Sequence, residues 1–106
     1  MFKQLTHKEL EGLISNQDVA IADVRNSDSF DEEHIASAIH LSMAALQEFC
    51  EKADKTKPIV VYCYHGISSQ SVAQHLVDHG FPEVYSLIGG FEGWKDHHSA
   101  SDASKS

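Results

Sequence analysis

The stretch from Pro58 to Gly80 constrains the fold of this chain more than any other. Residues 59–62 form a short apolar run after a proline, which is typical of a strand that is buried on both faces. Apolar residues then recur at helical spacing over residues 72–77, and Gly80 stands where such a helix would end. The pattern predicts a strand, a tight loop and a helix, with Cys63 at the carboxyl end of the strand.

This position has a chemical consequence for Cys63. Unpaired backbone N–H groups and the positive end of a helix dipole converge at a helix N-terminus and favour an anion there. A thiolate at such a place has a lowered pKa, and it is the nucleophilic form of cysteine. Free cysteine is also a common core residue. However, a structural cysteine needs neither the flexible Gly66 nor the helix-starting Ser68 and Ser69, so we favour a reactive Cys63.

Length and charge limit the possible functions. The 106 residues allow one domain with one core, and no apolar run approaches the roughly 20 residues of a membrane span. The N-terminus has no signal-peptide core, so we expect a cytoplasmic protein without a membrane partner. A net charge of −8 argues against a nucleic-acid partner. In a reducing compartment, the two cysteines are not expected to form a structural disulfide.

Strands and helices are expected to alternate along the rest of the chain. Thr6 and Glu9 form a capping box that opens the first helix. Further strands are expected at residues 2–5, 19–23, 38–41 and 84–87, and helices at residues 7–16, 29–34, 43–53 and 91–95. This alternation predicts an α/β fold around a mostly parallel sheet with residues 19–23 at its centre, and a ligand site beyond the carboxyl ends of the strands.

The loop after Cys63 argues against phosphate chemistry. A cysteine-dependent phosphatase places an arginine six residues after its nucleophile, whereas Ser69 stands there and the loop has no lysine or arginine. Backbone N–H groups, the Ser68 and Ser69 hydroxyls and His65 would have to hold the anion, which suits a persulfide better than a phosphoryl group. For both serines we favour the role of helix cap over that of catalyst. We leave open whether His65 acts on substrate or faces solvent.

Other polar residues are assigned structural roles. Arg25 follows a strand and is expected to pair with a carboxylate rather than to bind substrate, and Asp23 is expected to organise the same loop. The spacing of His34 and His40 matches no zinc pattern, and the remaining histidines are interpreted as scattered solvent or core positions. Cys50 lies on an apolar helical face and is expected to be inert.

Residues 63–69 resemble the active-site loop of the rhodanese family, and they are most similar to that of the single-domain thiosulfate sulfurtransferases of the GlpE type. Three further segments match the family in the expected order: residues 23–25, 30–40 and 89–94. Glu33 and Ser37 depart from the family pattern, which usually has glycine at both places. These departures concern the backbone of a turn away from the nucleophile.

The resemblance implies a three-layer α/β/α rhodanese-like domain over residues 1–97, around a mostly parallel five-stranded sheet. Residues 98–106 have low complexity and no apolar period, and they are expected to form a disordered tail. Catalysis is expected from Cys63, which takes sulfur from thiosulfate as a persulfide and passes it to cyanide or to a thiol acceptor such as thioredoxin. No metal or organic cofactor is implied. The substrate-binding residues are then expected to be Tyr64, His65, Gly66, Ile67, Ser68 and Ser69, with Tyr64 and Ile67 forming an apolar rim.

Other functions remain open from the sequence. A sulfur carrier that receives persulfide from a desulfurase and delivers it to a partner would have the same loop. A small cysteine phosphatase or arsenate reductase is disfavoured by the missing arginine. A non-catalytic interaction module is disfavoured because it has no need for the nucleophile.

Overall fold

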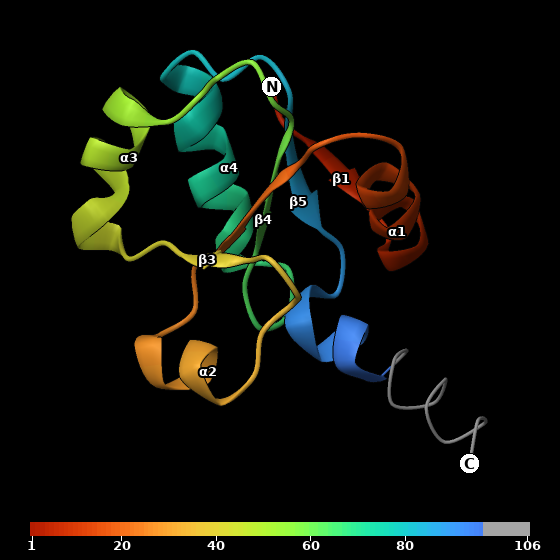
Figure 1. Cartoon of the computed structure of the whole chain (residues 1–106). Helices are drawn as coiled ribbons and strands as arrows, with labels where there is room; N and C mark the ends of the chain where they lie inside the picture. The colour runs from red at the N-terminus through yellow and green to blue at the C-terminus, as the bar shows by residue number, and fades with distance from the viewer. Residues whose placement is uncertain (97–106) are drawn as a thin grey trace.

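The computed structural model describes residues 1–96, which form a five-stranded sheet with helices on both faces (Figure 1). The elements are β1 (Lys3–Leu5), α1 (His7–Asn16), β2 (Ala20–Asp23), α2 (Ser27–Glu32), β3 (Ile39–His40), the 3₁₀ helix η1 (Met43–Ala45), α3 (Leu46–Lys52), β4 (Ile59–Tyr62), α4 (Ser68–Asp78) and β5 (Val84–Leu87). A last helical segment covers residues 90–96. The tail expected at residues 98–106 lies outside the described residues. Within residues 1–96, no helix combines the length and the apolar character needed to cross a bilayer.

The strands lie in the order β1-β5-β4-β2-β3, and every pairing is parallel. The sheet is therefore fully parallel rather than mostly parallel. The strand predicted at residues 19–23 is β2, which lies inside the sheet between β4 and β3, and the middle strand is β4. Asp23 of β2 is in register with Tyr62 of β4, which places the end of β2 next to Cys63.

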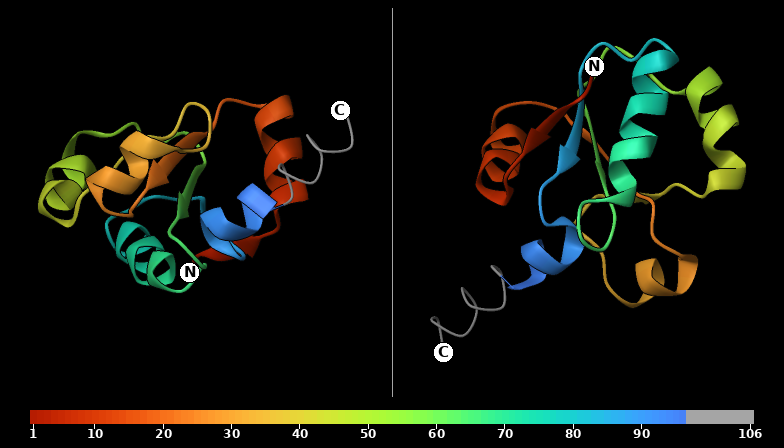
Figure 2. Two further views of the ribbon diagram at one scale, coloured as in Figure 1. Left: turned by 90° about the horizontal axis from the view of Figure 1, so that it is seen from below. Right: turned by 180° about the vertical axis from the view of Figure 1, so that it is seen from behind.

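The two faces of the sheet bury separate apolar clusters, as the alternation of side chains along a strand requires. In β4, Ile59 and Val61 face one cluster, whereas Val60 and Tyr62 face the other. Helices α3 and α4 cover the first face, and α1 covers the second (Figures 1 and 2). The predicted three-layer α/β/α arrangement is confirmed. Helix α2 and segment 90–96 flank the loop between β4 and α4 at the carboxyl edge of the sheet (Figure 2).

Local capping signals place most helix starts correctly. The Thr6–Glu9 capping box is present, with the Glu9 N–H donating to Thr6 Oγ1 and the Thr6 N–H donating to Glu9 Oε1. Helix α2 starts two residues earlier than predicted, because the Asn26 side chain caps it by accepting from the Ser29 N–H at 2.9 Å.

The predicted helix at residues 43–53 is divided in the structure. Ser42 caps its start by accepting from the Ala45 N–H at 3.2 Å, but the first turn is the 3₁₀ helix η1, and α3 follows from Leu46. Strand β3 is also shorter than the predicted 38–41.

Ser37 adopts a left-handed backbone conformation with φ +72°, the only positive φ of a non-glycine residue in the described chain. This conformation is unfavourable for a residue with a Cβ atom. It occurs where the family usually has glycine, so the departure noted in the sequence corresponds to local backbone strain. Glu33, at the other departure, is extended with φ −166° and carries no such strain.

Candidate active site

Cys63 immediately follows β4 and opens the loop that leads into α4. The N–H groups of Gly66 and Ser69 both donate to Cys63 Sγ, each at 3.2 Å. The Ser69 hydroxyl lies 3.4 Å from the same sulfur. The residue is only 4% exposed, yet the N–H groups of Gly66 and Ser69 are both directed at its sulfur. The loop therefore forms an anion-binding nest that encloses its own nucleophile.

Hydrogen bonds from segment 90–96 fix two carbonyls at the start of the loop. The Phe91 N–H donates to the Cys63 carbonyl at 2.8 Å, and the Glu92 N–H donates to the Tyr64 carbonyl at 3.0 Å. These donors are the first N–H groups of a helical segment and have no partner within it. The Tyr64 carbonyl shares its peptide group with the His65 N–H, which is one of the groups that stabilise the Cys63 thiolate.

Two glycines allow this close approach. Gly66 has φ +87°, and a Cβ atom there would lie 2.9 Å from the Leu87 carbonyl oxygen. Gly90 has φ +59°, and a Cβ atom there would lie 2.6 Å from the carbonyl oxygens of Cys63 and Tyr64. Neither position can accept a side chain without moving the loop.

The two cysteines differ in acidity. Burial tends to raise the pKa of Cys63, but the Ser69 hydroxyl and the N–H groups of Ser69, Gly66 and His65 stabilise the thiolate and bring the pKa below its ordinary value. Burial raises the pKa of Cys50. Of the two, Cys63 is therefore the one whose surroundings favour the thiolate form.

The Ser69 hydroxyl is held in turn by Ser86 of β5, whose Oγ lies 2.8 Å away. Both serines are buried. Our interpretation of Ser68 and Ser69 as helix caps is wrong: Ile67 occupies the cap position, and no side chain caps α4. Sequence reasoning also missed Ser86, although a serine within the apolar strand 84–87 was an available signal.

The other loop residues form the surface above the sulfur. Tyr64 is 37% exposed and Ile67 is 75% exposed, and His65 and Ser68 are exposed as well. The Tyr64 hydroxyl is anchored on α2, where it bonds the Ser29 hydroxyl and accepts from Asn26 Nδ2 at 3.1 Å. The loop residues expected to bind substrate thus include a buried set that contacts the sulfur and an exposed rim.

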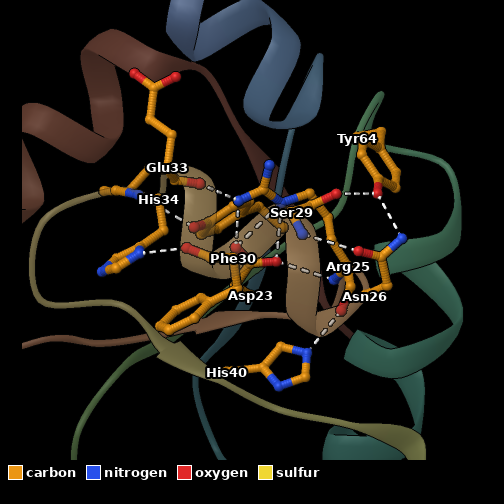
Figure 3. A network of polar contacts seen from close by, with 11 residues as sticks. Asp23, Arg25, Asn26, Ser29, Phe30, Glu33, His34, His40 and Tyr64 are labelled. Atoms are coloured by element: carbon orange, nitrogen blue, oxygen red, sulfur yellow. Dashed lines mark hydrogen bonds and ion pairs between the residues drawn. The ribbon is translucent and has the colours of Figure 1, made fainter.

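The predicted ion pair of Arg25 is present and is shown in Figure 3. Arg25 Nη2 lies 2.6 Å from Asp23 Oδ2, and Arg25 Nε donates to Asp23 Oδ1 at 3.0 Å. Nη2 also donates to the Glu33 carbonyl at 2.6 Å, and the guanidinium carbon lies 4.1 Å from the centre of the Phe91 ring. Because both partners are buried and Nε and Nη2 are already bonded, Arg25 ties α2 to the sheet.

Two histidines of the same network bond to backbone oxygens (Figure 3). His40 Nε2 donates to the Arg25 carbonyl at 2.7 Å, and His34 Nδ1 donates to the Phe30 carbonyl at 2.8 Å. A backbone oxygen therefore orients each of these two rings. The histidines of α4 are different: His75 and His79 lie with Cys50 in one cluster, so they are not scattered as we expected.

Comparison with known proteins identifies the family. The sequence model of the family described as Rhodanese-like domain matches residues 6–97. A relative from Coxiella burnetii named thiosulfate sulfurtransferase GlpE is 69% identical over 105 residues, covering 99% of this chain and 98% of the relative. A relative of the same name from Shewanella oneidensis is 44% identical over 95 residues, covering 90% of this chain and 94% of the relative. A crystal structure of a rhodanese-related protein from Thermoplasma volcanium has the same fold, with a TM-score of 0.80 and 22% identity over 91% of this chain and 93% of that one. The chain therefore belongs to the family of rhodanese-like domains.

Proposed function

We propose that this protein is a thiosulfate sulfurtransferase that carries the transferred sulfur as a persulfide on Cys63. The observation that supports this most directly is the pair of backbone N–H groups, from Gly66 and Ser69, that donate to Sγ at 3.2 Å. The relatives that are 69% and 44% identical bear the name thiosulfate sulfurtransferase, which agrees with this chemistry.

In the first step, the Cys63 thiolate attacks the outer sulfur of thiosulfate. A new S–S bond forms at Cys63 while the S–S bond of thiosulfate breaks, and the electron pair of that bond leaves with sulfite. No external oxidant or reductant is needed. The lowered pKa of Cys63 supplies the thiolate, and the loop N–H groups that stabilise it are placed to stabilise the negative charge of the persulfide as well.

In the second step, an acceptor attacks the terminal sulfur and Cys63 leaves as a thiolate, which restores the starting state. The acceptor is cyanide in an assay, and we propose a thiol acceptor such as thioredoxin in the cell. Two successive transfers through a covalent intermediate give ping-pong kinetics. We propose no nucleic-acid or membrane partner.

The site is poorly suited to phosphoryl transfer. A phosphoryl group needs a cationic fork for its oxygens. Residues 63–69 contain no lysine or arginine, and Arg25 is already held by Asp23 and the Glu33 carbonyl. A single charged sulfur can be stabilised by N–H groups alone, which is the kind of ligand that this loop can hold.

Intact-mass spectrometry after incubation with thiosulfate tests the proposal. We expect the mass of one added sulfur atom, located on the peptide that contains Cys63 and removed by cyanide. The Cys63→Ser variant should not be loaded and should lose thiosulfate:cyanide transfer, whereas the matched Cys50→Ser variant should keep both. Sulfur on Cys50, or transfer by the Cys63→Ser variant, would contradict the mechanism. Efficient turnover with thiosulfate as the sole donor favours an enzyme, whereas poor loading and slow turnover would favour a sulfur carrier.

The location and extent of the catalytic unit are part of the same proposal. Both cysteines are free thiols, which suits the reducing cytoplasm in which we place the protein. The family match ends at residue 97, in agreement with a catalytic domain of residues 1–97. We expect a chain shortened by residues 98–106 to keep its thiosulfate:cyanide transfer.

A further inference from the structure

Helices α3 and α4 lie on the same face of the sheet (Figure 1). They bring three side chains of metal-binding type together. Cys50 lies on α3, His75 in the last turn of α4 and His79 at its C-cap. The sulfur of Cys50 and one ring nitrogen of each histidine all lie within 4.8 Å of one another. The Cys63 loop is at the opposite end of α4, so this cluster is distinct from the catalytic site.

We propose that Cys50, His75 and His79 form a zinc site that clips α3 to α4. One thiolate and two imidazoles are ligands that zinc prefers, and three protein ligands leave a fourth position for water or a small ligand. The proposal does not rest on the sulfurtransferase function, and it assigns the metal no part in that reaction.

The spacing of the histidines supports the site. Residues four apart on a helix project from the same face, so His75 and His79 present their rings together. The ring centres are 4.1 Å apart and the rings are inclined by 29°. Their shared face is the one that meets α3, which supplies the sulfur.

The tautomer of His79 also suits a ligand. Its Nδ1 lies 2.8 Å from the His75 carbonyl oxygen, which can only accept, so Nδ1 carries the proton. The lone pair is therefore on Nε2. Metal-binding histidines characteristically donate their second ring N–H to a backbone carbonyl or carboxylate in this way.

The dimensions of the cluster are compatible with zinc. Zinc bonds of about 2.0–2.3 Å in tetrahedral geometry separate the ligand atoms by roughly 3.3–3.7 Å. The cluster must contract by at most roughly 1.5 Å to reach such separations. Cys50 is 3% exposed, whereas His75 is half-buried and His79 is exposed, so the cluster lies between the core and the surface.

Cobalt(II) is the probe, because it replaces zinc and gives absorption bands that report thiolate ligation and tetrahedral geometry. The titration uses the full chain with Cys63→Ser, which leaves Cys50 as the only thiol. We expect one cobalt per chain with a thiolate-to-cobalt charge-transfer band, displaced by zinc, and a higher melting temperature with zinc. Adding Cys50→Ala should abolish the band, and adding His79→Gln should weaken cobalt binding at least about tenfold.

Two controls make the result decisive. His34→Gln is the same substitution on a histidine outside the cluster, and it should leave cobalt binding unchanged. His97→Gln with His98→Gln removes the histidine pair of the chain end and should also have no effect. Because His79 is exposed, His79→Gln still tests the site if Cys50→Ala fails to fold. The proposal is overturned if no charge-transfer band forms, if the band survives Cys50→Ala, or if either control weakens binding as much as His79→Gln does.

Discussion

Removing the Ser69 hydroxyl should slow the loading of Cys63 with sulfur. That hydroxyl lies 3.4 Å from Sγ, and Ser86 Oγ lies 2.8 Å behind it, so Ser86 can donate to Ser69 while Ser69 donates to the thiolate. A hydrogen bond to a charged group contributes about 1.5–3 kcal/mol. The long contact to sulfur places Ser69 at the lower end of this range, which corresponds to about a tenfold slower reaction.

The pH dependence gives the sign of the effect. The pKa of Cys63 is lowered: burial disfavours the thiolate, but the Ser69 hydroxyl and the loop N–H groups favour it by more. The rate of loading should therefore rise with pH through that lowered pKa and level off above it. In Ser69→Ala the pKa of Cys63 moves up towards its ordinary value, so the rise moves to higher pH and the loss is largest on the acid side.

Stopped-flow measurement of sulfite release over a pH series checks this prediction, with circular dichroism to confirm folding. Ser86→Ala should have the same kind of effect but a smaller one, because it acts only by orienting Ser69. Ser71→Ala is the matched control, since Ser71 is exposed on the same helix and should change neither rate nor pH profile. The reasoning is refuted if Ser69→Ala and Ser71→Ala have the same pH profile, or if the rise in Ser69→Ala moves to lower pH.

Three further predictions concern stability. Ser37→Gly should raise the free energy of unfolding in urea by about 0.5–1 kcal/mol, because glycine adopts the left-handed backbone at φ +72° without strain. An unchanged urea midpoint would show that Ser37 is not strained. Gly90→Ala should lower that free energy by about 1–3 kcal/mol and slow sulfur transfer, because its Cβ would lie 2.6 Å from two loop carbonyl oxygens. Gly12→Ala is the control: a Cβ there meets no atom within 4 Å, so the variant should stabilise the protein. Equal effects of the two substitutions would refute the packing argument. Arg25→Gln should destabilise by about 3–5 kcal/mol because it leaves Asp23 buried without its ion pair, and adding Asp23→Asn should restore part of this loss in the same urea assay. A double variant no more stable than the single one would show that the unpaired carboxylate is not the cause.

Features that depend on neighbours along the chain could be predicted from the sequence. The apolar run of β4 and the helical spacing of α4 placed Cys63 between a strand end and a helix start, as the structure has it. The Thr6–Glu9 capping box and the Ser42 cap were likewise correct. In each case the contacts that stabilise the element lie within a few residues, so their spacing is visible in the sequence.

Features that depend on how distant elements pack could not be predicted in this way. The contact between Ser69 and Ser86 was not predicted because Ser86 lies on β5, and only the strand order places β5 beside β4. Cys50 and His75 meet because α3 and α4 pack on the same face of the sheet, which no local spacing indicates.

The sequence by itself thus determined the succession of strands and helices and the position of the nucleophile at the end of β4. Only the tertiary structure decided what surrounds that nucleophile: segment 90–96 binds the Cys63 and Tyr64 carbonyls, and Gly90 lets the segment approach. The physical reason is that these two carbonyls need hydrogen-bond partners once the loop packs against the rest of the protein. Their partners come from a part of the chain that folding, and not sequence proximity, brings to the loop.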